Sequence, residues 1–209
     1  MKTALIISGG EFSLPEPLPE YEYAIACDKG AEYAKACGIS PNAVLGDFDS
    51  YTGNIEEAFP DAEILKYPAM KDDTDTMLAV KLALSKCFDH LILLCALGNR
   101  MDHTISNLQS LHYIAIHGAI GELYSSREHF RTLSAIEGSL TLSKRENYSL
   151  SLFSLSDTCA GLSISGAKYN AENISLTNSF PLGHGNDFVN PEVTISLKKG
   201  ILLIVESLI

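Results

Sequence analysis

The chain has 209 residues, and its 15 basic and 26 acidic side chains give a formal net charge of −11 at pH 7. This balance argues against binding to a nucleic-acid backbone, because such binding needs many Lys and Arg side chains to displace counterions from phosphates. The five cysteines are odd in number and include no C-x-x-C pair, so neither a disulfide framework nor a zinc knuckle is indicated. The longest apolar run, 91–97, is far shorter than the roughly 20 residues that cross a bilayer, and the run at 4–7 is too short for a signal-peptide core. We therefore expect a soluble cytoplasmic protein that binds metals or small molecules and neither nucleic acid nor membrane.

The composition changes near residue 130. Fifteen alanines precede this point and four follow it, whereas nine serines precede it and 13 follow. Alanine favours helix, and alternation of Ser or Thr with aliphatic residues favours strand. We predict an α/β domain over 1–130 and a domain of different architecture over 131–209.

The first part alternates strand and helix patterns in chain order. Short apolar runs predict strands at 3–7, 24–27, 43–45, 64–67 and 90–96. Helical spacing predicts helices at 29–37, 76–87 and 104–117. The residues expected to form the buried faces of the last two are Met77, Val80 and Leu84, and then Ile105, Leu108, Leu111 and Ala115. Strands separated by helices indicate a three-layer α/β domain with a mainly parallel sheet, whose ligands bind beyond the carboxyl ends of the strands.

The second part consists of short alternating segments separated by turn residues. These predict strands at 139–142, 148–155, 161–165, 193–197 and 201–205, with Gly138, Gly166 and Gly200 between them. Five or more such strands indicate a small β-sandwich.

Acidic side chains gather where the predicted strands of the first part end. The aspartates that follow strands are Asp28, Asp47, Asp49, Asp72, Asp73, Asp75 and Asp102. In a parallel sheet they would surround one crevice, and such a cluster repels itself unless a cation sits in it or some members are protonated. Magnesium, which prefers hard oxygen ligands, suits this site. Simpler explanations remain for each group alone. Asp72 or Asp75 could cap a helix, and Asp47 with Asp49 could form a turn. Asp28 beside Lys29 and Asp102 beside Arg100 could be solvated surface charges.

Two glycine-containing loops complete the predicted crevice. Gly9-Gly10 follows the first strand, and Gly98-Asn99-Arg100 follows the most apolar one. Small residues let a backbone approach phosphate oxygens, and Arg100 offers a planar fork that can hold a phosphate at two points. Gly9-Gly10 alone is more often an ordinary turn, and a histidine at a helix start, such as His103, is more often structural than catalytic, although it could titrate near neutrality.

At this point the motifs resemble those of the thiamine pyrophosphokinase family. Gly46-Asp47-Phe48-Asp49-Ser50, Lys71-Asp72-Asp73-Thr74-Asp75 and Gly98-Asn99-Arg100-Met101-Asp102-His103 follow the family's order and spacing. Further matches are Asp28-Lys29-Gly30-Ala31, Asn107, Gly161 to Tyr169, and Gly185-Asn186-Asp187-Phe188. The chain departs from the family pattern at Lys29, Cys95 and Asn99, where glycines are expected, and at Gly185-Asn186-Asp187 in place of Ser-Asn-Glu.

The resemblance implies transfer of the terminal diphosphate of ATP to the hydroxyl of thiamine, with release of AMP. It also implies an α/β nucleotide-binding catalytic domain, a thiamine-binding β-sandwich, and a homodimer whose active sites are shared between subunits. It assigns Mg²⁺ to Asp47, Asp49 and Asp75, which are catalytic together with Arg100 and Asp102. The residues implied to contact nucleotide or diphosphate are Gly9, Gly10, Asp28, Asp72, Thr74, Gly98, His103 and Asn107. Those implied to meet thiamine are Asn186, Asp187 and Phe188.

Two other functions fit part of the pattern. Asp47-x-Asp49-Ser50 is similar to the nucleophile motif of haloacid-dehalogenase-type phosphatases, although it follows at least two predicted strands instead of lying on the first. From a different class, a non-catalytic nucleotide or metal sensor could carry the same carboxylates. Mg²⁺-dependent release of AMP from ATP would separate the enzyme from the sensor.

Overall fold

The computed structural model describes residues 1–48, 51, 53–68, 70, 72–98 and 100–209. Contacts within the chain divide it into two compact units, Met1–Ser126 and Arg127–Ile209.

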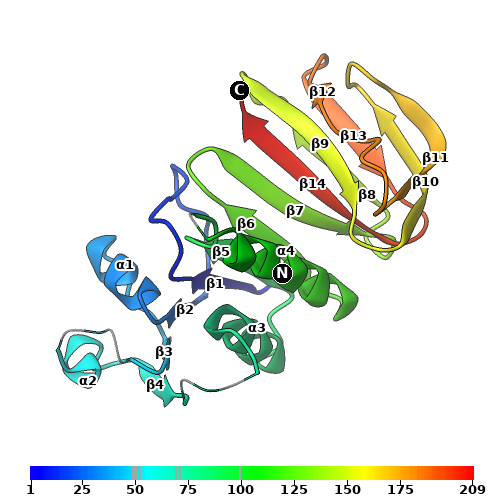
Figure 1. The fold of residues 1–209 in the computed structure, drawn as a ribbon. Helices are drawn as coiled ribbons and strands as arrows, with labels where there is room; N and C mark the ends of the chain where they lie inside the picture. The colour runs from blue at the N-terminus through cyan, green and yellow to red at the C-terminus, as the bar shows by residue number, and fades with distance from the viewer. Residues whose placement is uncertain (49–50, 52, 69, 71, 99) are drawn as a thin grey trace. The chain divides into compact units, whose positions relative to one another are not determined.

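The described residues of the first unit form parallel strands and helices (Figure 1). The strands are β1 (Thr3–Ile7), β2 (Tyr23–Cys27), β3 (Ala43–Gly46), β4 (Glu63–Lys66), β5 (His90–Leu94) and β6 (Ile120–Tyr124). The helices are α1 (Gly30–Ala36), α2 (Ile55–Ala58), α3 (Asp75–Ser85) and α4 (Met101–Ile116). Every pairing between these strands is parallel, and their order in the sheet is β6-β5-β1-β2-β3-β4.

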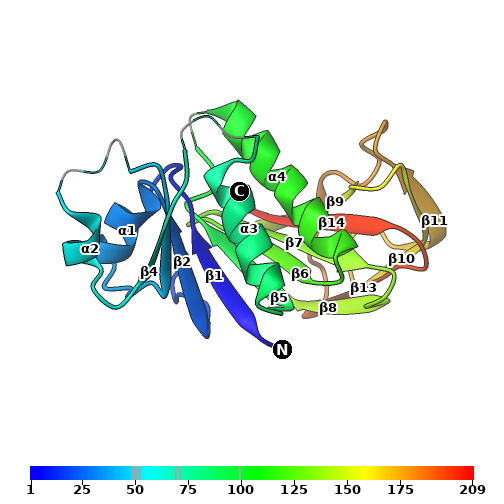
Figure 2. The same ribbon diagram turned by 90° about the horizontal axis from the view of Figure 1, so that it is seen from below.

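Both faces of this sheet are covered, as the continuous apolar strands predict. Along β1, Ala4, Leu5 and Ile6 alternate between the faces, and all three are fully buried. Leu5 and Ile7 share a core with Ala31 and Ala34 of α1, while α3 and α4 lie on the opposite face (Figure 2). The predicted three-layer α/β arrangement with a parallel sheet is therefore confirmed.

The buried faces of α3 and α4 differ from those predicted. In α3 the buried residues are Thr76, Ala79, Val80 and Ala83, whereas Met77 and Leu84 are only half-buried. In α4 Ile105 is 54% exposed, so the prediction that it is buried is wrong. The reason is that small side chains let a helix approach the sheet closely, and the larger side chains then lie along its flanks.

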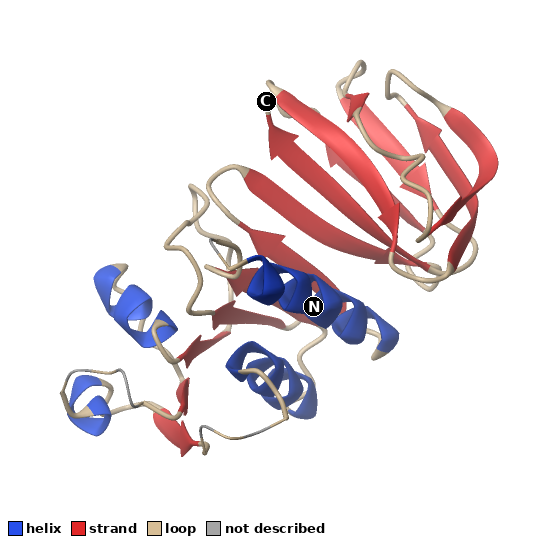
Figure 3. Cartoon of the chain, viewed as in Figure 1, coloured by secondary structure: helices blue, strands red, loops and turns tan. Residues whose placement is uncertain are grey.

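The second unit is an antiparallel β-sandwich (Figure 3). One sheet has the order β12-β9-β14-β7 and the other β11-β10-β13-β8. Their strands are β7 (Glu128–Ser134), β8 (Ser139–Ser143), β9 (Tyr148–Ser154), β10 (Thr158–Ser165), β11 (Ala171–Thr177), β12 (Asn186–Asp187), β13 (Glu192–Ser196) and β14 (Ile201–Leu208). Leu152 and Leu202 of one sheet and Leu162 and Ile195 of the other belong to one buried cluster. The sandwich prediction is confirmed.

The helices of the described residues include none with both the length and the apolar character needed to cross a membrane.

Candidate functional site

The carboxyl ends of β2 and β3 place two of the predicted aspartates side by side. Asp28 directly follows β2, and its backbone N–H donates to the carbonyl of Leu45 in β3 over 2.9 Å. A Cβ built on Gly46 would collide with Oδ1 of Asp28, so this carboxyl lies directly over the glycine that precedes Asp47. Both aspartates are half-buried. The expected crevice at this edge therefore brings Asp28 and Asp47 together.

Helix α3 begins at the same edge. Its first residue is Asp75, and the hydroxyl of Thr74 caps it by accepting from the backbone N–H of Met77 at 3.2 Å. The Cys27 thiol at the end of β2 donates to the carbonyl of Asp75 over 3.7 Å. The start of α3 is thus held against the end of β2, which places Asp75 beside the Asp28 edge.

A buried hydroxyl pair fixes α3 to the central strand. Oγ of Ser8, the residue after β1, lies 2.9 Å from Oγ1 of Thr76, and both residues are buried. The sequence did not predict a contact between these two residues. Its one indication of their place in the site is that Ser8 directly precedes Gly9-Gly10 and Thr76 directly follows Asp75.

The Gly9-Gly10 loop packs against the loop after β5. Gly10 N–H donates to the Cys95 carbonyl over 2.8 Å, and a Cβ on Gly10 would collide with the carbonyls of Cys95 and Leu97. A glycine is therefore needed at position 10 for a steric reason. Asn107 is buried in α4, and its Nδ2 donates to the Ala96 carbonyl over 2.6 Å. Its amide thus anchors the second glycine-containing loop, in which Gly98 has the positive φ of 143°.

Arg100, Asp102 and His103 form an exposed group at the start of α4. Nη2 and Nε of Arg100 donate to the two carboxylate oxygens of Asp102 at 2.5 and 3.2 Å. The hydrogen bond from Arg100 holds the pKa of the Asp102 carboxyl below its ordinary 3.8, and the same contact raises the pKa of the guanidinium. This charged fork is open to solvent, where a phosphate can reach it.

The remaining aspartates of the predicted cluster are Asp49, Asp72 and Asp73. Asp72 is exposed, Asp73 forms an ion pair with Lys81 at 2.6 Å, and Asp49 lies outside the described residues. Among the residues that the structure describes, no three His, Cys, Asp or Glu side chains gather closely enough to hold a metal. The donor chemistry of Asp47 and Asp75, two half-buried carboxylates, nevertheless suits a hard cation such as Mg²⁺.

In the sandwich, Asn186 is a buried anchor. Its Oδ1 accepts from the backbone N–H of Tyr169 at 2.9 Å and of Asp187 at 3.0 Å, and its Nδ2 donates to the Tyr169 carbonyl at 2.9 Å. Asp187 is partly exposed and pairs with Lys168 at 2.9 Å, while Phe188 packs in the sandwich core. Of these three side chains, that of Asp187 is the one accessible to a ligand.

Comparison with known proteins identifies the family. The family models described as the catalytic domain and the vitamin B1 binding domain of thiamin pyrophosphokinase match residues 15–120 and 139–202, respectively. A thiamine pyrophosphokinase of Bacillus subtilis is 31% identical to this chain over 99% of both proteins. The chain belongs to the thiamine pyrophosphokinase family. It is therefore an enzyme of this kinase family, and the resemblance stated from its motifs is confirmed.

Solved structures of thiamine pyrophosphokinases have the same fold. The enzyme from Bacillus subtilis superposes with a TM-score of 0.88 and 29% identity, covering 100% of both chains. The enzyme from Geobacillus thermodenitrificans superposes with a TM-score of 0.81 and 26% identity, covering 98% of this chain and 97% of its own. Neither the phosphatase nor the sensor interpretation finds support in these thiamine pyrophosphokinase matches.

Proposed function

We propose that this thiamine pyrophosphokinase transfers the terminal diphosphate of ATP to the hydroxyl of thiamine and releases AMP. The observation that carries the proposal is the 31% identity to a curated thiamine pyrophosphokinase over 99% of both chains. The location of Asp28, Asp47 and Asp75 and of two glycine-containing loops at one sheet edge supports it, because ligands of parallel sheets bind there. We assign the nucleotide to the domain 1–130 and thiamine to the domain 131–209.

Magnesium is the metal that we propose for the carboxylates. Asp47, Asp49 and Asp75 would hold it, and hard carboxylate oxygens suit this ion. When bound, it neutralises charge on the phosphate oxygens. Asp28, Asp72, Thr74, His103 and Asn107 then belong to the surrounding nucleotide subsite.

The residues of the chain contribute mainly by alignment and charge. In the reaction the thiamine oxygen forms a bond to the β-phosphorus of ATP, while the bond between that phosphorus and the bridging oxygen to the α-phosphate breaks. AMP leaves with that oxygen, and a carboxylate accepts the hydroxyl proton. Such transfers depend on positioning and on stabilising charge over the equatorial oxygens. Arg100 offers two parallel donors to a phosphate, and the backbone of Gly9, Gly10 and Gly98 leaves room for close approach.

For thiamine, we propose recognition by the segment of Asn186, Asp187 and Phe188. Thiamine carries a permanent positive charge on its thiazolium ring, which the Asp187 carboxylate complements. Asn186 and Phe188 hold this segment in place through the contacts described above. We further propose a cytoplasmic homodimer in which this segment of one subunit completes the site of its partner.

The direct test of the activity is incubation with ATP, Mg²⁺ and thiamine, followed by mass analysis of the products. We expect thiamine diphosphate and AMP in equal amounts. Asp47→Asn should lower turnover by about 10²-fold or more, because it removes a charge that supports the metal, whereas the exposed Asp61→Asn serves as a matched control. Formation of ADP or free phosphate in place of AMP would contradict the proposal.

The shared site is tested by mixing two inactive variants. Asp47→Asn and Asp187→Ala impair opposite parts of the proposed site, and neither removes a buried anchor. Subunit exchange should restore activity, because one site of each mixed dimer is then intact. Mixed dimers without recovered activity would refute the shared site.

A further inference from the structure

Lys29 stands at the nucleotide edge of the first unit. It lies between Asp28 and Gly30, directly before α1, with helical backbone angles of −58° and −22°. A Cβ built on Gly9 would lie 3.4 Å from Cβ of Lys29 and 3.8 Å from its backbone N. The Lys29 side chain therefore leaves the backbone beside the Gly9-Gly10 loop, and it is exposed to solvent.

Tyr33, one turn further along α1, orients this lysine. Nζ of Lys29 lies 5.4 Å from the centroid of the Tyr33 ring, a distance at which a cation is attracted to an aromatic face. The Tyr33 hydroxyl donates to the carbonyl of Gly10 over 2.9 Å, and its ring packs on Phe12 at 5.1 Å between centroids. Tyr33 thus connects the lysine, the helix and the glycine loop.

The charges around Lys29 make it available to an anion. Arg100 is engaged by Asp102, whereas within the described part of the chain the Lys29 ammonium forms no ion pair with a carboxylate. The carboxylate that acts on the Lys29 ammonium is that of Glu32. The carboxyls of Asp28, Asp47 and Asp75 belong to the sheet edge that Lys29 adjoins, where they would repel a nucleotide phosphate. A cation at this position offsets that repulsion.

We propose that Lys29 binds the phosphate chain of the nucleotide and that Tyr33 is its positioning residue. The inference rests on the proposed function and adds to the proposed nucleotide contacts a residue that they do not include. A lysine suits this role as a mobile point charge, which follows the phosphates without the fixed geometry of a guanidinium.

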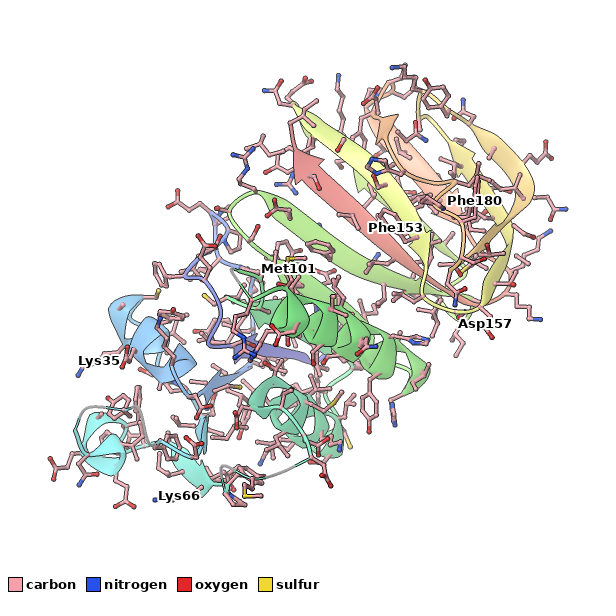
Figure 4. All side chains as sticks on the ribbon, viewed as in Figure 1. Lys35, Lys66, Met101, Phe153, Asp157 and Phe180 are labelled. Atoms are coloured by element: carbon pink, nitrogen blue, oxygen red, sulfur yellow. The ribbon has the colours of Figure 1, made fainter. Side chains whose placement is uncertain are left out.

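Binding of ATP with Mg²⁺ in the absence of thiamine tests the proposal by calorimetry. Lys29→Met should weaken binding about tenfold, the loss of one charge-assisted hydrogen bond, and Lys29→Arg should restore most of the affinity. The matched control is Lys35→Met, because Lys35 lies on the same helix and points away from it into solvent (Figure 4). ATP affinity unchanged in Lys29→Met, with wild-type thermal stability, would overturn the proposal.

Two further measurements separate positioning from folding. Tyr33→Phe keeps the ring but removes the hydrogen bond to Gly10, so we expect a higher KM for ATP with an unchanged KM for thiamine. A fall in thermal stability with no change in KM for ATP would show that Tyr33 is only structural. A wild-type chain that binds ATP in a Lys29-dependent way but forms no thiamine diphosphate would overturn the proposed function and support the Lys29 assignment.

Discussion

Arg100 and Asp102 form an ion pair whose two side chains are 72% and 64% exposed. An exposed pair contributes little to stability because water and salt screen it. The pair matters for ligand binding, because the bidentate contact holds the Arg100 guanidinium in one plane at the start of α4. A phosphate that binds Arg100 must compete with the Asp102 carboxylate for the same donors.

This pairing predicts a pH dependence. Because the pKa of Asp102 is lowered from 3.8 by Arg100, the pair is present above pH 3.8 and is lost as the pH falls through the lowered value. Carboxyl chemical shifts followed by NMR should give a midpoint below 3.8 in the wild type and closer to 3.8 in Arg100→Gln. Equal midpoints in the two proteins would contradict the pairing.

The Ser8–Thr76 hydroxyl pair predicts a coupled loss of stability. Thr76→Val keeps the shape of the side chain but leaves the buried Ser8 hydroxyl without this 2.9 Å partner, at a cost of about 1–3 kcal/mol. In a double-mutant cycle with Ser8→Ala, urea unfolding should reveal a coupling of about 1 kcal/mol.

The exposed Thr141–Thr194 hydroxyl pair, at 3.0 Å, provides the control. Thr194→Val should change the free energy of unfolding by no more than about 0.5 kcal/mol. If Thr76→Val and Thr194→Val cost the same, the buried pair does not hold α3 in place.

Among the elements, the parallel strands β1 to β5 could be predicted, whereas the parallel strand β6 and several polar strands were missed. β1 has the predicted bounds Thr3–Ile7, because its apolar residues from Ala4 to Ile7 are all buried. Strand β7 was missed because charged residues interrupt its pattern, and they are tolerated through pairs such as His129 with Glu206 and Arg131 with Glu137. Strand β11 was missed because it lies at the edge of its sheet and buries only Leu176 fully.

The part of the site that is formed by residues at the ends of strands could be predicted from the sequence. Asp28 and Asp47 come directly after strands that pair in parallel, so their proximity follows from topology. The contacts of Ser8 with Thr76 and of Tyr33 with Gly10 could not be predicted, because they depend on how each helix packs against the sheet. The contacts of Asn186 could not be predicted either, because its side-chain amide forms hydrogen bonds with the backbone N–H and carbonyl of Tyr169, 17 residues earlier in the chain.

The close approach of α1 to β1 predicts an effect of a single methyl group. A Cβ on Gly30 would collide with the carbonyl oxygen of Ile7, so Gly30→Ala should cost about 1–3 kcal/mol as an overpacked contact and should weaken ATP binding. The measurements are urea unfolding and calorimetric titration with ATP.

Gly38→Ala is the control for this substitution. Gly38 has a φ of 69° and no neighbouring atom within 4 Å of a built Cβ, so alanine there costs about 1–2 kcal/mol of backbone strain alone. It should leave ATP affinity unchanged. Equal ATP binding by Gly30→Ala and the wild type would show that α1 can move without disturbing the site.

Over the whole molecule, the negative charge is concentrated in one unit. Residues 1–126 carry eight basic and 18 acidic side chains, a formal charge of −10, whereas residues 127–209 carry seven and eight, a charge of −1. The proposed nucleotide site therefore lies in the unit that most strongly repels a polyanion.

This asymmetry predicts an unusual salt effect. Without divalent cations, raising the salt concentration from about 20 to about 200 mM should increase the association rate of a fluorescent ATP analogue about threefold, because salt screens the repulsion. Stopped-flow measurements test this. A rate that falls with salt would show that local cations dominate the approach of the nucleotide.

The pairing of β1 also has a consequence for synthesis of the chain. Thr3 of β1 lies opposite His90 of β5, 87 residues later in the sequence. A ribosome adding about 5–20 residues per second needs roughly 4–17 seconds to reach that partner. During this time one edge of a strand whose last four residues are all apolar has no neighbour, which is the condition under which nascent chains associate with one another or recruit chaperones.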